Sequence, residues 1–208
     1  MRRVSTGVEG WLDEALKALL DGGVVALPTE TVYGLAAGIE NPAGQERICA
    51  IKGRPAAKPL PLQTASVRMA LAWGFRLGEG ATRLAQAFWP GPLTLVLPRP
   101  TTCPPWFAPG NKALALRVPS HNIALALLTG WGRPLAVTSA NRTGEPACLD
   151  GASVADLLSS EPGLFVIDAG AVSGGLPSTV VDATGVEPVI LRKGPIAPAE
   201  ILEAWHAK

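Results

Sequence analysis

This sequence has little histidine, no closely spaced cysteine pair and no long apolar run. The only two histidines in 208 residues are His121 and His206, which argues against histidine-based metal sites and catalytic triads. The three cysteines, Cys49, Cys103 and Cys148, are widely spaced and odd in number, so neither a disulfide framework nor a zinc site is expected. No apolar stretch approaches the roughly 20 residues that span a bilayer, and the N-terminus lacks the apolar core of a signal peptide. We therefore expect a cytoplasmic protein with no membrane segment and no metal site of its own.

Charged residues are also scarce, at 17% of the chain, and the formal net charge at pH 7 is only +1. A chain this close to neutral lacks the overall basic charge of a nucleic-acid-binding protein, so any basic surface must be local. Hydrophobic residues make up 48% of the sequence, enough for a proper core, and 23 glycines with 20 prolines predict many turns. Because no repeat or linker interrupts the chain, we expect one α/β domain over residues 1–208.

Apolar patterns along the chain predict strands that interleave with helices. Short apolar runs predict buried strands at 24–27, 60–63, 93–97, 113–118, 134–137, 164–167, 178–182 and 189–192. Helical spacing and flanking breakers predict helices at 10–21, 42–51, 66–73, 79–88, 122–128, 154–158 and 198–206. This alternation implies an open, twisted, mixed sheet flanked by helices.

One short segment is unusually basic, because Lys52, Arg54 and Lys58 fall within seven residues with no acid among them. Pro55 and Pro59 break any helix there, so the segment is predicted to be a loop. A basic loop in isolation is most often a solvated turn. Polar groups elsewhere in the chain favour the other interpretation, in which the three cations face an anion.

Small polar side chains follow two of the predicted buried strands. Pro28-Thr-Glu-Thr-Val-Tyr-Gly-Leu35 comes directly after the strand at 24–27, and Thr138-Ser-Ala-Asn-Arg-Thr-Gly144 follows the strand at 134–137. Strand ends are the usual place for sites in open α/β sheets, and hydroxyl and amide groups bind phosphate oxygens without adding charge. Polar turns, with a threonine or asparagine capping the next element, explain the same residues, and the first segment alone does not decide between the two.

Arg117 interrupts the apolar strand predicted at 113–118. An arginine in a buried strand is costly without a partner, so it must form a structural ion pair or bind an anionic ligand. Few acids lie near Arg117 in the sequence, and arginine grips carboxylates and phosphates with two hydrogen bonds. We therefore favour an anion anchor over a structural pair.

Seven short motifs extend over nearly the whole chain, and together they resemble one known family. The motifs are Pro28-Thr-Glu-Thr-Val-Tyr-Gly-Leu35, Lys52-Gly-Arg-Pro-Ala-Ala-Lys-Pro-Leu60, Trp89-Pro-Gly-Pro-Leu-Thr-Leu95, Leu116-Arg-Val-Pro119, Thr138-Ser-Ala-Asn141, Ser178-Thr-Val-Val-Asp182 and Leu191-Arg-Lys-Gly194. One such motif is a weak signal, but seven in order are a strong one. In this order they resemble the YrdC/Sua5 family, called TsaC in its short bacterial form. The resemblance implies a YrdC-like open sheet with a basic concave face.

The resemblance also implies an activity. Members of this family are L-threonylcarbamoyladenylate synthases, which convert L-threonine, bicarbonate or CO2, and ATP to threonylcarbamoyl-AMP and pyrophosphate. The product supplies the N6-threonylcarbamoyl group of adenosine 37 in tRNA, through a separate threonylcarbamoyltransferase complex. Positioning and charge stabilisation suffice for this nucleotidyl transfer, which suits a site of Lys, Arg and hydroxyl groups that has little histidine.

Residue roles carry over from the family by motif. By this resemblance, the threonine-binding roles fall on Thr31, Gln63, Arg117, Ser178 and the backbone of Val137. By the same resemblance, the ATP-binding roles fall on Arg54, Lys58, Ser139 and Arg192. Mg²⁺ is expected to be carried by the ATP phosphates. The groups expected to act on the reacting phosphates are Lys52, Arg54, Lys58, Ser139 and Asn141.

The chain departs from the family at a few positions. Many longer relatives have a histidine where Gln63 stands, and a nucleotide-contacting hydroxyl is replaced by Ala113 and another by Ala147. The chain also lacks the linker and C-terminal domain of the Sua5 type, so a single YrdC-like domain with a more open site is expected. The alternative function is an RNA-binding module that uses the same basic face for tRNA or double-stranded RNA, and weak tRNA binding is compatible with the synthase.

Overall fold

The computed structural model describes residues 1–55, 59–159, 161 and 163–207. The strands are β1 (Arg2–Ser5), β2 (Val24–Leu27), β3 (Gly34–Gly38), β4 (Leu62–Gln63), β5 (Leu93–Pro98), β6 (Ala113–Arg117), β7 (Leu135–Ser139), β8 (Leu164–Asp168), β9 (Thr179–Asp182) and β10 (Val189–Arg192). The helices are α1 (Trp11–Leu20), α2 (Pro42–Lys52), α3 (Val67–Ala72), α4 (Glu79–Phe88), α5 (Asn122–Trp131), α6 (Gly151–Leu157) and α7 (Pro198–His206). None of the helices in these ranges combines the length and apolar character needed to cross a membrane.

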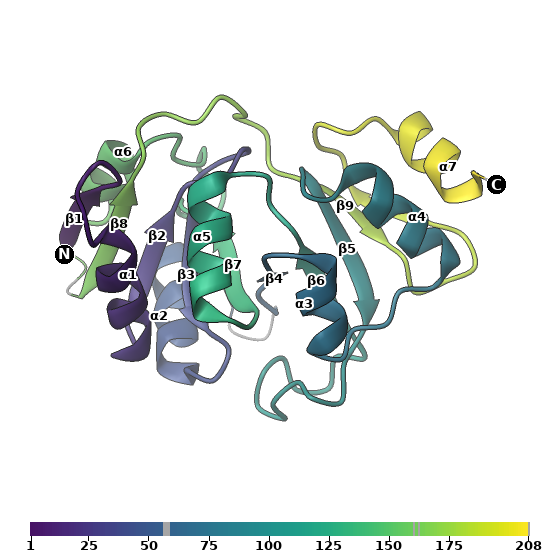
Figure 1. Cartoon of the computed structure of the whole chain (residues 1–208), viewed down its shortest axis with the longest axis horizontal. Helices are drawn as coiled ribbons and strands as arrows, with labels where there is room; N and C mark the ends of the chain where they lie inside the picture. Colours follow the sequence, from purple (N-terminus) through teal and green to yellow (C-terminus); the bar gives the residue numbers. More distant parts are fainter. Residues whose placement is uncertain (56–58, 160, 162, 208) are drawn as a thin grey trace.

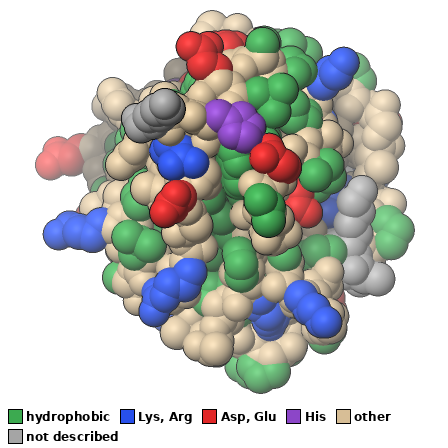
Figure 2. All heavy atoms as spheres, turned by 90° about the vertical axis from the view of Figure 1, so that its right-hand side faces the viewer, with side chains coloured by type: hydrophobic (Ala, Val, Ile, Leu, Met, Phe, Trp, Pro, Cys, Tyr) green, Lys and Arg blue, Asp and Glu red, His purple; other side chains and the backbone are tan. Residues whose placement is uncertain are grey.

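All the strands form one open mixed sheet in the order β1-β8-β2-β3-β7-β4-β6-β5-β9-β10. β8 is parallel to both of its neighbours, β1 and β2, whereas β3 is antiparallel to β2 and β7. Beyond β7, the pairs β4–β6 and β5–β9 are parallel, and β7–β4, β6–β5 and β9–β10 are antiparallel. The ends of the chain lie at opposite ends of the long axis (Figure 1). The predicted open mixed sheet flanked by helices is confirmed. On the side of the molecule that lies at the right of Figure 1, basic and acidic side chains are interspersed over the surface (Figure 2).

Alternating side chains give the sheet two apolar faces. On β2, Val24 and Ala26 belong to the larger hydrophobic cluster, while Val25 and Leu27 belong to a second one. Helices α1 and α5 cover the second cluster, and Figure 1 shows α5 in front of β3 and β7. Helices α2, α3, α4, α6 and α7 contribute side chains to the larger cluster. The half of the sheet from β1 to β7 therefore packs against helices on both faces.

Across the middle of the sheet, the face under α5 continues into the half formed by β4 to β10. Leu135 of β7 lies in the cluster that α5 covers, and Gln63 of β4 pairs with it and with Arg117 of β6. Paired residues share a face, so Gln63 and Arg117 extend the same row beyond Leu135. On β6, Leu114 and Leu116 fill the larger cluster on the opposite face. The polar row thus lies on a sheet whose back is a hydrophobic core.

Three features differ from the sequence-based expectation. Strands β1 and β3 were not predicted, because β1 is mostly exposed and polar and β3 is Gly-Leu-Ala-Ala-Gly, which lacks the β-branched side chains typical of strands. Pairing on both sides of β3 forms the strand despite this composition. Lys52 ends helix α2 rather than beginning the predicted loop, and Gly53 closes the helix in a left-handed conformation.

Candidate active site

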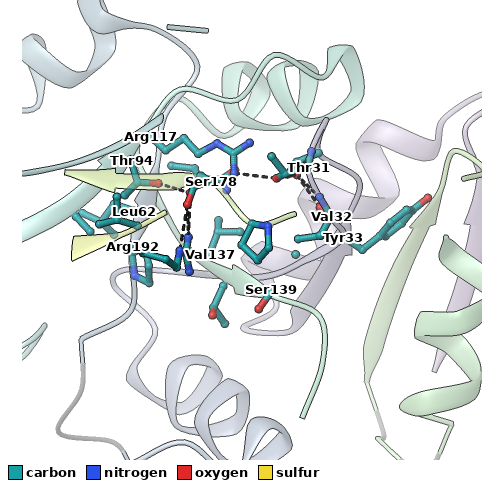
Figure 3. A pocket seen from close by; sticks show the side chains of 18 residues that line it. Thr31, Val32, Tyr33, Leu62, Thr94, Arg117, Val137, Ser139, Ser178 and Arg192 are labelled. Carbon is teal, nitrogen blue, oxygen red and sulfur yellow. Dashed lines mark hydrogen bonds between the residues drawn. The ribbon is translucent and has the colours of Figure 1, made fainter. Parts of the chain in front are cut away.

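A pocket opens on the sheet face that runs on from the α5 side, and it gathers side chains from most of the predicted motifs (Figure 3). Residues from β4, β5, β6, β7, β9 and β10 form its floor, and the loop between β2 and β3 forms one wall. Its polar or charged lining residues are Thr29, Thr31, Tyr33, Gln63, Thr94, Arg117, Thr138, Ser139, Ser178 and Arg192. All five residues expected on the threonine side, Val137 included, therefore lie in one pocket.

Arg117 is held at one side of this pocket by three protein groups. Its Nη2 donates to Glu30 Oε1 at 2.7 Å, its Nη1 to Thr31 Oγ1 at 3.0 Å and its Nε to the Gly91 carbonyl at 3.1 Å. The second carboxylate oxygen of Glu30 accepts the Ser120 N–H at 3.1 Å. The scarcity of acids near Arg117 in the sequence was therefore misleading, because the β2–β3 loop supplies Glu30. Arg117 both forms a structural ion pair and lines the pocket.

Ser178 and Arg192 occupy another part of the wall (Figure 3). The Ser178 hydroxyl lies 2.7 Å from Thr94 Oγ1 and accepts a hydrogen bond from Arg192 Nη2 at 3.1 Å. Arg192 also donates from Nε and Nη2 to the Ser178 carbonyl, at 3.0 and 2.8 Å. Arg192 was predicted on the ATP side, yet its protein contacts are with Ser178 on the threonine side.

A β-bulge aims Arg192 at the pocket. Ile190 pairs with Val181, but the next partner, Val180, pairs with Arg192, so one extra residue of β10 lies between them. Val181 belongs to the core cluster and Val180 lines the pocket. The extra residue turns Arg192 to the face of Val180, a known use of bulges next to sites.

The pocket is cationic. Among its described lining residues the charged groups are Arg117 and Arg192, and no carboxylate is present. Burial lowers the pKa of Arg192, and the charge of Arg117 lowers it further. Burial also lowers the pKa of Arg117, which Glu30 opposes. Because the charge of Arg117 disfavours the charged form of Arg192, an anion bound in this small pocket would stabilise the Arg192 guanidinium.

Lys52 forms a second cluster behind β7, with Ser139 and Asn141. Its Nζ donates to the Ser139 carbonyl at 2.6 Å, the Asn141 carbonyl at 2.9 Å and Asn141 Oδ1 at 2.8 Å. The Ser139 hydroxyl donates to the same Oδ1 at 2.6 Å. Burial lowers the pKa of Lys52 to about 8, with a further contribution from the charge of Arg54. The predicted Lys–Ser–Asn group is therefore assembled, and Ser139 belongs to both this cluster and the pocket.

The other two cations of the basic segment are Arg54 and Lys58, and the structure describes Arg54. Arg54 follows the end of α2 and donates from Nη2 to the Pro59 carbonyl at 2.7 Å. Burial lowers the pKa of Arg54. Lys58 lies outside the described residues, so its predicted role stays a prediction. Lys52 thus connects the start of the segment to the end of β7, while Arg54 contacts Pro59 within the segment.

Gln63 lies beside Arg117 in the sheet and is 7% exposed. Its Oε1 is buried without a hydrogen-bond partner in the described part of the chain. A buried amide oxygen without a partner is costly, so a ligand with an N–H or O–H group in the pocket would satisfy it. Gln63 is therefore suited to accept a hydrogen bond from a ligand in the pocket.

Five residues of the site were not named as such by sequence reasoning: Glu30, which holds Arg117, and the pocket-lining Thr29, Tyr33, Thr94 and Thr138. Glu30 lies inside the motif that includes Thr31, but its partner Arg117 is 87 residues away, so spacing gave no signal. Thr94 is the only polar residue of the run Leu93–Leu97, and this break in an apolar strand was a signal for a pocket-facing side chain. Ala113 begins β6, at the opposite end of that strand from Arg117, and Ala147 lies in the loop after Asn141.

The structure is therefore that of an open-sheet α/β protein, and one face of its sheet bears a small cationic pocket. A family model described as "Telomere recombination" and named for Sua5, YciO and YrdC matches residues 17–194. The chain belongs to this Sua5/YciO/YrdC family.

Individual relatives agree with the family assignment. The chain is 40% identical over 195 residues to a protein of Pyrococcus abyssi and 38% identical over 190 residues to one of Bacillus subtilis, both named threonylcarbamoyl-AMP synthase. These matches cover 93% and 90% of the chain but only 57% and 54% of the relatives' lengths. The crystal structure of P. abyssi Sua5 complexed with L-threonine superposes with a TM-score of 0.88 at 38% identity, over 99% of this chain and 60% of that one.

Proposed function

We propose that this protein is an L-threonylcarbamoyladenylate synthase, a nucleotidyltransferase that makes threonylcarbamoyl-AMP and pyrophosphate from L-threonine, bicarbonate or CO2, and ATP. The observation that supports it most directly is the position of Ser139. This residue lines the cationic pocket and also contacts Lys52 and Asn141 in the neighbouring cluster. A carbamate in the pocket and an α-phosphate at the cluster would meet there. The relatives' names and the threonine complex of Sua5 support the same substrates.

In this proposal the pocket binds threonine. The substrate carboxylate pairs with the guanidinium of Arg117, while Thr31 and Ser178 offer hydroxyl groups to its polar atoms. The unpartnered oxygen of Gln63 accepts a hydrogen bond from the amine or hydroxyl group. The backbone and side chain of Val137 contact the aliphatic part. The negative charge of the carboxylate also offsets the effect of the Arg117 charge on Arg192.

The reaction needs positioning more than proton transfer by a side chain. The threonine amine adds to CO2 and loses a proton, which gives a carbamate. A carbamate oxygen then attacks the α-phosphorus of ATP, the bond to the β-phosphate oxygen breaks, and pyrophosphate leaves. Lys52, Arg54, Lys58 and Arg192 are proposed to stabilise the negative charge on the phosphates, with Ser139 as a hydrogen-bonding group. Holding the two substrates in line supplies much of the acceleration.

ATP is a substrate here, and Mg²⁺ is proposed to be bound by its phosphates and by water. The described residues that line the pocket offer hydroxyl, amide and guanidinium groups rather than the carboxylates that hold Mg²⁺. The product would pass to a threonylcarbamoyltransferase complex in the cytoplasm for transfer to adenosine 37 of tRNA. The RNA-binding alternative is not favoured, because the relatives are named as synthases, although weak tRNA contact is compatible with either role. One domain is supported by a sheet that takes its two edge strands, β1 and β10, from opposite ends of the chain.

Pyrophosphate release tests the proposal. Purified protein with MgATP, bicarbonate and L-threonine is expected to release pyrophosphate, and omission of threonine is expected to abolish release. The curated synthase from B. subtilis, assayed alongside, shows that the conditions are adequate. Identification of threonylcarbamoyl-AMP by mass spectrometry confirms the product. No threonine-dependent release, with the control active, would contradict the proposed function.

The rate is expected to fall as the pH rises above about 8. The pKa of Lys52 is lowered to about 8, so this cation is present below that pH and is lost as the pH increases through it. In the Lys52→Arg variant the charge persists, so any remaining activity should lack this decline. The measurement is the pH dependence of kcat/KM for ATP between about pH 7 and 9.5, because this ratio reports ionisations of the free protein, to which the lowered pKa of Lys52 belongs. A flat profile for the wild-type protein would show that the charge of Lys52 is not required.

A further inference from the structure

The connection between β8 and β9, residues 169–177, joins the two halves of the sheet and is here called the strap. Figure 1 shows it passing along the top of the molecule, from the strands near the N-terminus to those near the C-terminus. The hydroxyl of the buried Tyr33 binds its first residues, because Tyr33 Oη donates to the Gly170 carbonyl at 2.9 Å and accepts the Ala169 N–H at 3.1 Å. The start of the strap is thereby fixed to a residue of the β2–β3 loop.

The middle of the strap contacts the loop that supplies Thr31. The Gly175 N–H donates to the Thr31 carbonyl at 2.8 Å. At Gly174, a Cβ atom would lie 2.4 Å from the Glu30 carbonyl oxygen, 2.5 Å from the Thr31 carbonyl oxygen and 2.6 Å from Thr31 Cα. These atoms belong to the backbone, so no change of side-chain rotamer could relieve the contact. Only glycine fits at position 174 while the Thr31 backbone stays in place.

The end of the strap leads directly into the facing wall. Pro177 and Ser178 both line the pocket, and Ser178 bears the hydroxyl that Thr94 and Arg192 contact. Behind them, a Cβ at Gly194 would lie 2.4–2.6 Å from the backbone atoms of residues 177–179. Ser178 is therefore held from behind, and Thr31 is held by the strap. The two walls are connected through a short segment whose contact point is Gly174.

We propose that Gly174 is a positioning residue that fixes the separation of Thr31 and Ser178, and with it the fit of the amino-acid substrate. This inference rests on the proposed function for the identity of that substrate. The close approach at Gly174 holds Glu30 and Thr31 against Arg117, since both residues accept hydrogen bonds from its guanidinium group. A larger residue at 174 must displace either the strap or the loop. Either movement shifts Thr31 relative to Ser178 on the threonine side, whereas Lys52, Ser139 and Asn141 are held to one another by their own hydrogen bonds.

The Gly174→Ala variant tests this role. We expect kcat/KM for L-threonine to fall on the order of 10²-fold, mainly through a higher KM, because displacements of about 1 Å in a site have effects of this size. The KM for ATP at saturating threonine should rise less than the KM for threonine, because Arg192 contacts Ser178 while Lys52, Ser139 and Asn141 are held by their own hydrogen bonds. Ser173→Ala is the matched control, because Ser173 is an exposed neighbour in the same strap, and it should behave as wild type. Amide hydrogen exchange gives a readout without catalysis: the Gly175 N–H should exchange faster in Gly174→Ala than in wild type.

Tyr33→Phe serves as a second variant if Gly174→Ala does not fold. It keeps the ring and removes both hydrogen bonds to the start of the strap, so a smaller rise in the threonine KM is expected, with faster exchange of the Ala169 N–H. A wild-type threonine KM and unchanged Gly175 exchange in Gly174→Ala would overturn the inference. Equal losses for threonine and ATP would also overturn it, because they indicate a general structural defect. If the wild-type protein itself shows no threonine-dependent turnover, the proposed function fails, and the exchange experiment still tests the strap contact.

Discussion

Replacement of Arg117 by Met is expected to lower the free energy of unfolding by about 3 kcal/mol, the largest stability effect in the site. Removal of one partner from a buried ion pair typically costs about 3–5 kcal/mol, because the other charge remains without compensation. Arg117 is 6% exposed, and its partner Glu30 lies 2.7 Å away. The lower end of the range applies because the Glu30 side chain keeps 21% exposure and the hydrogen bond from the Ser120 N–H. Urea denaturation at pH 7 measures the change.

An exposed ion pair in the same protein provides the control. Arg2 pairs with Glu14 at 2.6 Å, but the Arg2 side chain is 66% exposed, so Arg2→Met should cost only about 0–1 kcal/mol. The double variant Arg117→Met/Glu30→Gln should recover part of the loss, because it removes the uncompensated carboxylate. Equal destabilisation by Arg117→Met and Arg2→Met would mean that the buried pair does not support the fold.

Replacement of Lys52 by Met is expected to reduce kcat for pyrophosphate release on the order of 10²–10³-fold, comparable to removal of an oxyanion-hole donor. The methionine side chain retains most of the apolar stem but has no charge and no N–H donors. The charge near the reacting phosphates is lost, and the carbonyl oxygens of Ser139 and Asn141 lose their shared donor. Steady-state kinetics with saturating ATP and threonine measures the effect.

Lys17→Met is the matched control for Lys52, because the Lys17 side chain is 74% exposed and pairs with Asp21 one helical turn away. This variant should retain wild-type kcat. Circular dichroism and urea denaturation of Lys52→Met separate a catalytic loss from unfolding. If folded Lys52→Met keeps more than about a tenth of the wild-type rate, the proposed role in charge stabilisation is wrong.

The apolar pattern of the sequence predicted the strands that are apolar along their length. It did not predict features that depend on how a strand pairs with its neighbours in the sheet. β3 contains two glycines and no β-branched residue, and it is a strand because β2 and β7 pair with it on both sides. The β-bulge in β10 was equally hidden, since the pattern Val-Ile-Leu-Arg gives no sign of an extra residue. Without the bulge, strict alternation would place Arg192 on the core face with Ile190.

For the site, the motifs identified residues that do converge, but not what each one contacts. Arg117 was predicted within the motif Leu116–Pro119 and Gln63 as a departure from the family after the basic segment, and the two lie side by side in the sheet. Lys52 was predicted as a loop cation and instead ends a helix, with its Nζ hydrogen-bonded to backbone and side-chain oxygens. Such contacts depend on tertiary packing, because the partners are 87 and 89 residues away in the sequence.

The strands under the pocket bury one face and present the other to the ligand, and this arrangement separates stability from specificity. On β5, Leu93, Leu95 and Leu97 fill the core, whereas Thr94 between them faces the pocket. Truncation of a buried leucine to alanine costs about 2–5 kcal/mol, but replacement of a pocket-facing side chain removes little core contact. Substitutions on the pocket face can therefore change which ligand is accepted while the apolar packing that keeps the protein folded stays intact. The same backbone is thus suited to ligands of different size and polarity.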